Sequence, residues 1–328
     1  MPEIENKMPS TRVISLDSVS AAPTEWLWYP YIPLGKVTIM QGDPGEGKST
    51  VALRLAAAVS RGTDITDPGK AVTTPDYVIY QNAEDGIADT VKPRLMREKA
   101  DCGMIFCMED AEFPLTMTDG RLESLVRQLR PRLVVLDPLQ AYLGDDVDMH
   151  RANEIRPVMS RLAGLAEEYH CAVLLIGHMN KMQKTKNLYR GLGSIDLTAA
   201  ARSVLLVARD PAHPENRVIT QIKNSLAPEG KPVAFQIAED GALVYLGEYE
   251  ISPDVLMQQD SGQKPRSQRD RAEALLLEWL DREQPLYLRD LYPVADSEDI
   301  SKQSLLRAKR NLHLISEQTP NGWVIRKP

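Results

Sequence analysis

Short apolar segments alternate with amphipathic segments over most of the chain. Several of the apolar runs have no polar position, which is typical of strands that are buried on both faces. Segments with helical spacing separate these runs. The predicted strands are Lys36–Gln41, Tyr77–Gln81, Leu133–Asp137, Ala172–Ile176 and Ser203–Val207, and the predicted helices are Ser49–Ser60, Ala88–Ala100, Leu122–Leu129 and Glu154–Tyr169. This alternation predicts an α/β fold with a mostly parallel central sheet.

Beyond Ala201 the helical spacing ends and predicted strands follow one another closely. Val218–Lys223, Val233–Ile237 and Ala242–Leu246 are separated by Gly and Pro turns, which predicts antiparallel strands added to the sheet. The segment Pro253–Ser267 is polar and has no apolar period, so we interpret it as a linker. The predicted organisation is an N-terminal segment (1–35) that packs on the core or on a neighbouring subunit, a core (36–250), a linker (251–267) and a second unit (268–328).

The second unit combines helices with a basic surface. In the predicted helix Ser301–Asn311, apolar residues recur at i, i+3 and i+7, so one face is expected to pack inward. The opposite face is polar and basic and consists of Gln303, Arg307 and Arg310. A predicted helix over Arg271–Leu280 precedes it, and a hairpin containing Trp323, which we expect in the core, follows it. This order resembles a winged helix-turn-helix, whose second helix can enter the major groove of duplex DNA, although winged folds also bind proteins.

Composition excludes several classes of protein. Hydrophobic residues make up 43% of the 328 residues, but no apolar run approaches the roughly 20 residues of a membrane-spanning helix. The three cysteines lack the spacing of a disulfide framework or a zinc site, and the first thirty residues lack a signal-peptide pattern. We therefore expect a cytoplasmic protein with no membrane partner.

Charge is distributed unevenly along the chain. The formal net charge is −7, whereas residues 301–328 contain six Lys and Arg against Glu317 alone. An acidic body with a basic end argues against a uniformly basic coat for nucleic acid. It indicates instead that the second unit can meet phosphate groups.

A phosphate-binding sequence follows the first predicted core strand. Gly42-Asp43-Pro44-Gly45-Glu46-Gly47-Lys48-Ser49 connects that strand to a helix and has the spacing of a P-loop. Glycines let successive N–H groups turn toward phosphate oxygens, and the helix N-terminus adds positive potential. Lys48 is expected to reach the β- and γ-phosphates. The predicted nucleotide-binding residues are Gly42, Asp43, Pro44, Gly45, Glu46, Gly47, Lys48, Ser49 and Thr50.

A P-loop also needs oxygen ligands for Mg²⁺. The Ser49 hydroxyl is expected to contact the metal directly. Asp137 ends the predicted strand Leu133–Asp137, where a carboxylate can orient the metal through its water shell. A strand-terminal Asp is also a common cap, but its pairing with a P-loop favours the metal role.

Hydrolysis requires a group that activates the attacking water. Glu84 and Asp85 both follow the predicted strand Tyr77–Gln81, at the sheet edge where the nucleotide must lie. Their chemistry alone does not choose between them. His178 follows another predicted strand and is placed either to sense the γ-phosphate or to cap its strand.

Taken in order, these motifs resemble those of RecA-type ATPases. More narrowly, three further stretches resemble the RepA-like AAA-type ATPases of plasmids, phages and other mobile elements, namely Trp26-Leu27-Trp28-Tyr29-Pro30, Arg190-Gly191 to Ser194, and Ala201-Arg202-Ser203. The resemblance covers about residues 14–247. It implies a RecA-like P-loop NTPase core with antiparallel C-terminal strands, and ATP as the nucleotide.

The resemblance also implies an assembly and individual roles. Members form rings, often hexameric, with nucleotide between neighbouring subunits and DNA in the channel. Glu84 then corresponds to the catalytic carboxylate and His178 to the sensor. A cation from the adjacent subunit completes the site, and Lys223 matches that position best, with Arg202 next. The competing interpretation for both cations is a solvated charge at the edge of a strand.

A cationic segment lies just beyond His178. Lys181, Lys184, Lys186 and Arg190 occur there without an acidic residue. RecA-like rings contact single-stranded DNA with a loop at this place, and phosphate neutralisation gives salt-dependent binding with little sequence preference. The alternative is a solvated loop with incidental charge.

The leading hypothesis is an ATP-hydrolysing DNA motor or helicase of the RepA-like hexameric type, acting in replication or maintenance of DNA. The alternative is an ATP-dependent DNA-binding regulator or loader that does not translocate. A metabolic P-loop kinase is disfavoured, because it needs neither the cationic segment nor the basic second unit.

Overall fold

The computed structural model describes two compact units, Met1–Leu256 and Met257–Pro328. The described residues of the first unit are 14–109, 114–144, 147–149, 151–178 and 195–256. Those of the second are 272, 275–277, 279–280, 286–297, 302–312, 314–320 and 322–326. Among these residues, no helix has the length and apolar character needed to cross a membrane.

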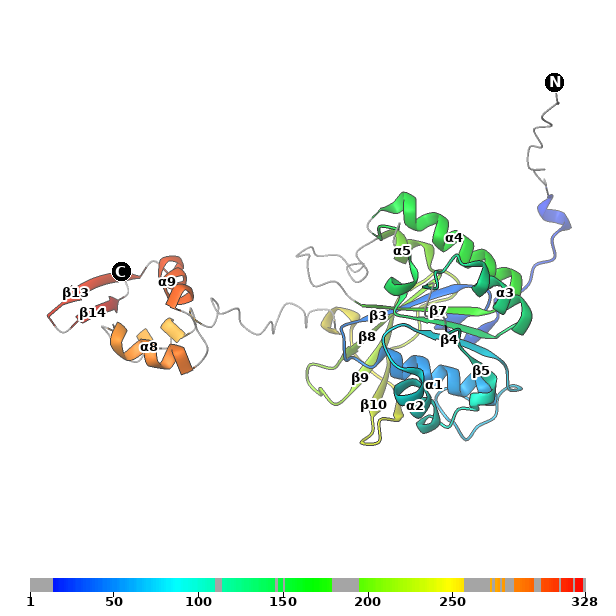
Figure 1. Ribbon diagram of the computed structural model, residues 1–328, viewed down its shortest axis with the longest axis horizontal. Helices are drawn as coiled ribbons and strands as arrows, with labels where there is room; N and C mark the ends of the chain where they lie inside the picture. The colour runs from blue at the N-terminus through cyan, green and yellow to red at the C-terminus, as the bar shows by residue number, and fades with distance from the viewer. Residues whose placement is uncertain are drawn as a thin grey trace, which may run out of the picture. The chain divides into compact units, whose positions relative to one another are not determined.

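A nine-stranded sheet forms the centre of the first unit, in the order β11-β10-β9-β8-β3-β7-β6-β4-β5 (Figure 1). The strands from β8 to β5 in this order are parallel, and they are β3 (Val37–Gly42), β4 (Val78–Asn82), β5 (Ile105–Phe106), β6 (Leu133–Asp137), β7 (Ala172–His178) and β8 (Ser203–Arg209). The antiparallel strands are β9 (Arg217–Asn224), β10 (Val233–Ile237) and β11 (Leu243–Glu248). The expected fold class, a parallel core with later antiparallel strands, is confirmed.

Helices cover both faces of this sheet (Figure 1). One face carries α1 (Lys48–Arg61) and α2 (Lys92–Arg97), and the other carries α3 (Gly120–Leu129) and α4 (Ala152–Tyr169). A π-helical turn, Ile87–Val91, precedes α2, and α5 spans Ile195–Ala200. Short 3-10 turns occur at Leu16–Ser18, Cys102–Met104 and Leu139–Tyr142.

Three strands are absent from the sequence expectations. β1 (Trp26–Trp28) and β2 (Ile32–Pro33) form a separate two-stranded sheet, and β5 (Ile105–Phe106) is the edge of the main sheet. Each contains only two or three residues, which is too short to establish a period of two along the sequence.

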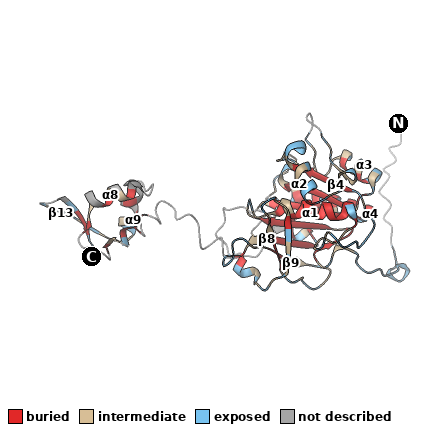
Figure 2. Cartoon of the chain, turned by 90° about the horizontal axis from the view of Figure 1, so that it is seen from below, coloured by how far each residue is buried: buried red, intermediate tan, exposed pale blue. Residues whose placement is uncertain are grey.

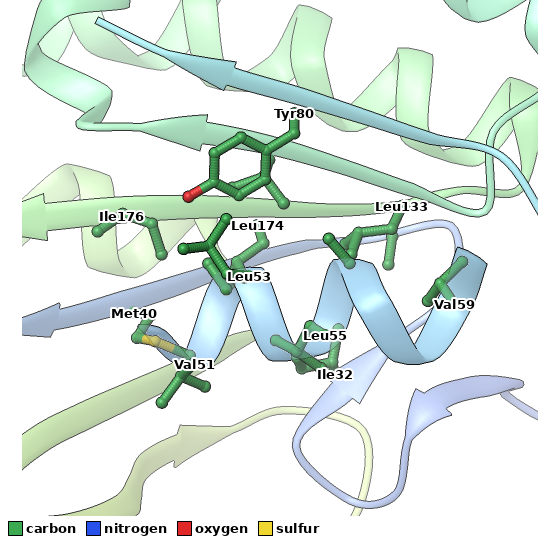
Figure 3. Close-up of a cluster of buried hydrophobic side chains, with 14 of the residues drawn as sticks. Ile32, Met40, Val51, Leu53, Leu55, Val59, Tyr80, Leu133, Leu174 and Ile176 are labelled. Carbon is green, nitrogen blue, oxygen red and sulfur yellow. The ribbon is translucent and has the colours of Figure 1, made fainter. Parts of the chain in front are cut away.

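The helix that follows the P-loop anchors the core. Every residue of α1 from Val51 to Ser60 is buried (Figure 2). Figure 3 shows Leu53 and Leu55 among side chains from four parallel strands, including Tyr80 and Leu174. Because α1 is fixed along its length, the position of the P-loop at its N-terminus is fixed as well.

A buried ion pair ties α1 to α2. Arg54 Nη1 lies 3.3 Å from Glu98 Oε2, and the side chains are only 7% and 3% exposed. Arg54 Nε also donates to the carbonyl of Ile65, and Glu98 Oε1 accepts the N–H of Leu243. Burial raises the pKa of Glu98, while Arg54 and the Leu243 N–H oppose that rise.

The second unit contains a three-stranded antiparallel sheet in the order β12-β14-β13. Its elements are β12 (Leu286–Tyr287), α8 (Leu288–Ser297), α9 (Lys302–Asn311), β13 (Ile315–Thr319) and β14 (Gly322–Arg326). A separate hydrophobic core includes Leu276, Leu291 and Leu305. The winged-helix interpretation of this order stays a prediction.

The expectation that Trp323 lies in the core is wrong, because its side chain is 51% exposed. β12 pairs only with Val324 and Ile325 of β14. Trp323 therefore lies in the two-stranded end of the hairpin, beyond the part that packs against the helices.

Replacing Arg54 with Met should lower the free energy of unfolding by about 3 kcal/mol or more, because the Glu98 carboxylate is left buried without its cation. Urea denaturation of the full chain measures this. The matched control is Lys70→Met at the more exposed Lys70–Asp64 pair (64% and 26% exposed), where a loss below about 1 kcal/mol is expected. Equal losses in the two variants would contradict the role of burial.

Candidate active site

The P-loop folds around its own lysine. Lys48 Nζ donates to the carbonyl oxygens of Gly42 and Asp43, both at 2.8 Å, and the residue is only 4% exposed. Gly45 and Gly47 have φ of 82° and 94°, which L residues with a Cβ rarely adopt. Burial lowers the pKa of Lys48, and the carboxylate of Asp137 is the largest opposing influence.

The two predicted metal ligands lie side by side. The Ser49 side chain is close enough to the Asp137 carboxylate to oppose the rise in its pKa, and the Tyr80 hydroxyl donates to Asp137 Oδ2 at 3.4 Å. Asp137 is 2% exposed, and burial raises the pKa of its carboxyl group. A hydroxyl beside a buried carboxylate is the oxygen set that Mg²⁺ takes next to phosphates, so these residues fit the metal.

Strand register brings the remaining predicted residues to the same edge. Gly42, at the end of β3, pairs with His178, at the end of β7. Asn82, at the end of β4, pairs with Asp137, at the end of β6. Since β7 lies between β3 and β6, the P-loop, His178 and Asp137 follow one another along one edge.

Glu84 and Asp85, which sequence chemistry alone did not separate, have different surroundings. Both backbone N–H groups donate to Asn82 Oδ1, at 2.9 and 2.6 Å. The Asp85 carboxylate is paired with Arg94 at 3.1 Å. The Glu84 carboxylate is 61% exposed and lies 3.5 Å from His178 Nε2. The geometry therefore leaves Glu84 accessible to a water at the nucleotide edge and holds Asp85 to α2.

The two candidate trans cations lie at the other end of the sheet. The N–H of Arg202 donates to the carbonyl of Val37, at the start of β3, and the Arg202 side chain is exposed. Lys223 Nζ donates to the carbonyls of Thr198, Ala199 and Ala201 at 2.8–2.9 Å. Neither cation is near the P-loop of its own chain, which follows the end of β3.

The predicted DNA-binding residues are only partly described. Lys181, Lys184, Lys186 and Arg190 lie outside the described residues. Gln303 and Arg307 are in α9, and Arg310, near the end of the same helix, is exposed.

Sequence reasoning missed two arginines beside the P-loop. Arg209, at the end of β8, lies 3.2 Å from Glu46 Oε1 and donates to the carbonyl of Gly45 at 3.3 Å. Arg217, at the start of β9, pairs with Arg209 in the strand register. Both are more than 160 residues beyond the P-loop, so no local spacing could have connected them to it.

The sequence matches the family described as "AAA domain" over residues 2–184. It is 20% identical over 210 residues to the DNA repair protein RadA of Halalkalibacterium halodurans, covering 63% of this chain and 40% of that protein. It is 21% identical over 222 residues to DNA repair protein RadA of Bacillus subtilis, covering 66% and 42%. The chain thus spans less than half the length of these relatives.

Among solved structures, one ATPase domain superposes on this chain with a TM-score of 0.49 and 17% sequence identity. That match covers 64% of this chain and 84% of the other.

Glu84→Gln should bind ATP as the wild type does but hydrolyse it at least about 100-fold more slowly, because it removes the general base. Asp85→Asn should keep most of the activity, since Asp85 is held by Arg94. Steady-state turnover and nucleotide titration of both variants measure the difference. Lys48→Ala is the reference that loses both binding and turnover. An inactive Asp85→Asn beside an active Glu84→Gln would reverse the assignment.

Proposed function

The chain belongs to the AAA domain family, and on that premise we propose that it is an ATP-hydrolysing DNA motor of the helicase type that works in the cytoplasm as a ring of subunits. Its P-loop and RecA-type sheet make it a P-loop ATPase. The observation that carries the proposal is the convergence of Lys48, the Ser49–Asp137 pair and the Glu84–His178 pair at one edge of the parallel strands.

Each group has a separable part in hydrolysis. The backbone N–H groups of the P-loop and Lys48 bind the phosphates. Ser49 and Asp137 would hold Mg²⁺, which would neutralise charge on the phosphate oxygens. Glu84 accepts the proton of the attacking water at its carboxylate, and His178, 3.5 Å away, orients that carboxylate toward the γ-phosphate.

The position of two other cations supports the proposed ring. Arg202 and Lys223 lie near the amino end of β3, whereas the P-loop is at its carboxyl end. A cation so placed can complete a nucleotide site only on a neighbouring copy. A hexamer, as expected from the RepA-like resemblance, is the assembly we propose.

DNA is the proposed partner. Two relatives that this chain matches are DNA repair proteins, which supports a DNA substrate for this chain. The cationic segment with Lys181, Lys184, Lys186 and Arg190 is proposed to bind single-stranded DNA. The exposed Arg310 of α9, with Gln303 and Arg307 on the same helix, is proposed to contact duplex DNA.

Single-stranded DNA should raise the ATP turnover of the full chain severalfold, and the rise should shrink as salt increases, because phosphate contacts release counterions. Turnover measured with and without an oligonucleotide tests this, and strand displacement should require ATP. DNA binding with unaltered turnover would instead favour a non-translocating regulator or loader. Lys48→Ala gives the background rate.

Arg310→Gln should weaken binding to duplex DNA uniformly across sequences and reduce the slope of log affinity against log salt by about one, the value for one phosphate contact. Fluorescence anisotropy at several salt concentrations measures the slope. The control is Arg127→Gln, an exposed arginine of α3 in the ATPase unit. If both variants keep the wild-type slope, α9 does not bind phosphate.

A further inference from the structure

The β8–β9 hairpin lies directly against the P-loop. A Cβ added to Gly42 would overlap the carbonyl oxygen of Val207, so the end of β8 leaves no space beside the start of the loop. Two residues later β8 reaches Arg209, and across the antiparallel register β9 begins with Arg217. The hairpin therefore brings two guanidinium groups to one side of the P-loop.

Arg217 lies beside the residue that begins the phosphate-binding helix. A Cβ added to Gly47 would be 3.2 Å from Arg217 Cδ and 3.2 Å from Phe235 Cε2. Gly47 is the N-cap of α1 and directly precedes Lys48. The stem of Arg217 and the ring of Phe235, which is 1% exposed, thus both lie against Gly47.

The charges around this position are unbalanced. Arg209 has Glu46 as a partner at 3.2 Å. Among the described residues, the buried Nε of Arg217 and the buried Oε2 of Glu46 have no hydrogen-bond partner. Burial lowers the pKa of Arg217, and the charge of Arg209 lowers it further, whereas the carboxylate of Glu46 opposes this fall. Like charges directly opposite each other in a sheet are destabilising, and so is a buried donor without an acceptor.

An anion beside Gly47 would offset both the repulsion between Arg209 and Arg217 and the lack of an acceptor for Arg217 Nε among the described residues. Arginine matches phosphate oxygens in geometry and stays charged, and Glu46 supplies only one carboxylate for two guanidinium groups. We propose that Arg217 is a nucleotide-binding residue that donates to a phosphate oxygen of the nucleotide held by the P-loop of its own chain. The inference rests on the proposed function, because it takes the P-loop ligand to be ATP.

The variant that tests this is Arg217→Met. Methionine keeps an unbranched stem over Phe235 and Gly47 but removes the charge and the donors. Its affinity for ATP and for inorganic tripolyphosphate should fall at least about tenfold, the loss expected for one hydrogen bond to a charged group. Its affinity for adenosine should not change. Arg217→Lys should recover part of the loss, and the exposed Arg127→Gln should bind as the wild type does.

A stability measurement separates this role from a structural one. Without nucleotide, Arg217→Met should melt at the same temperature as the wild type or higher, because the variant removes a positive charge opposite Arg209 and a buried Nε that has no acceptor in the described part of the chain. The rise in melting temperature caused by ATP should be smaller than in the wild type, since ligand stabilisation follows affinity.

Three outcomes would overturn the proposal. Unchanged binding of ATP and tripolyphosphate would show that Arg217 does not contact phosphate. An equal loss of adenosine binding would assign it to the nucleoside, and a lower melting temperature without nucleotide would make its role structural. A wild-type chain that binds no ATP at all would instead remove the proposed function itself, a result distinct from a defect confined to the variant.

Discussion

Parallel pairing of β3, β7, β6 and β4 is the constraint on which the site depends. Adjacent strands are about 4.8 Å apart, and parallel strands end at the same edge. The register places Gly42 opposite His178 and Asn82 opposite Asp137. Groups separated by up to 136 positions in the sequence therefore meet within a few strand spacings. A shift of one residue in any of these pairs would turn the terminal polar side chain to the other face of the sheet.

The site contains charged side chains that are buried away from solvent. Burial works against the charged forms of Lys48 and Asp137, and their mutual attraction offsets only part of that cost. The first unit holds them in place through α1, which is buried along most of its length and tied to α2 by the Arg54–Glu98 pair. Stability thus comes from the buried middle and C-terminal parts of the helix, while the N-terminal end is left available for an anion.

Much of this arrangement could be predicted from the sequence, because the informative signals are local. The P-loop is a contiguous motif, and Asp137 and His178 each end an apolar run that is long enough to identify as a strand. Residue chemistry alone could not choose between Glu84 and Asp85, although the family resemblance favoured Glu84, because the choice depends on Arg94, a partner on another element. Arg209 and Arg217 could not be found either, since their relation to Gly47 exists only after β8 and β9 pair beside β3.

The error over Trp323 has a similar origin, because burial in a hairpin depends on where the third strand stops.

Four cations of the first unit lie at two ends of the main sheet, and in the proposed ring this division would let one chain serve two nucleotide sites. Arg209 and Arg217 are at the carboxyl end of β3 and can act only on the P-loop of their own chain. Arg202 and Lys223 are at the amino end, where in the proposed ring they would face a neighbouring subunit. Lys223 already donates to three carbonyls in the segment Thr198–Ala201. To reach a phosphate it must give up those bonds, and a phosphate is an ionised acceptor that attracts an ammonium group more strongly than a single carbonyl does. In the proposed ring, Lys223 of one subunit would then exchange these carbonyls for a phosphate bound to its neighbour. That exchange would link the nucleotide to the C-terminal end of α5.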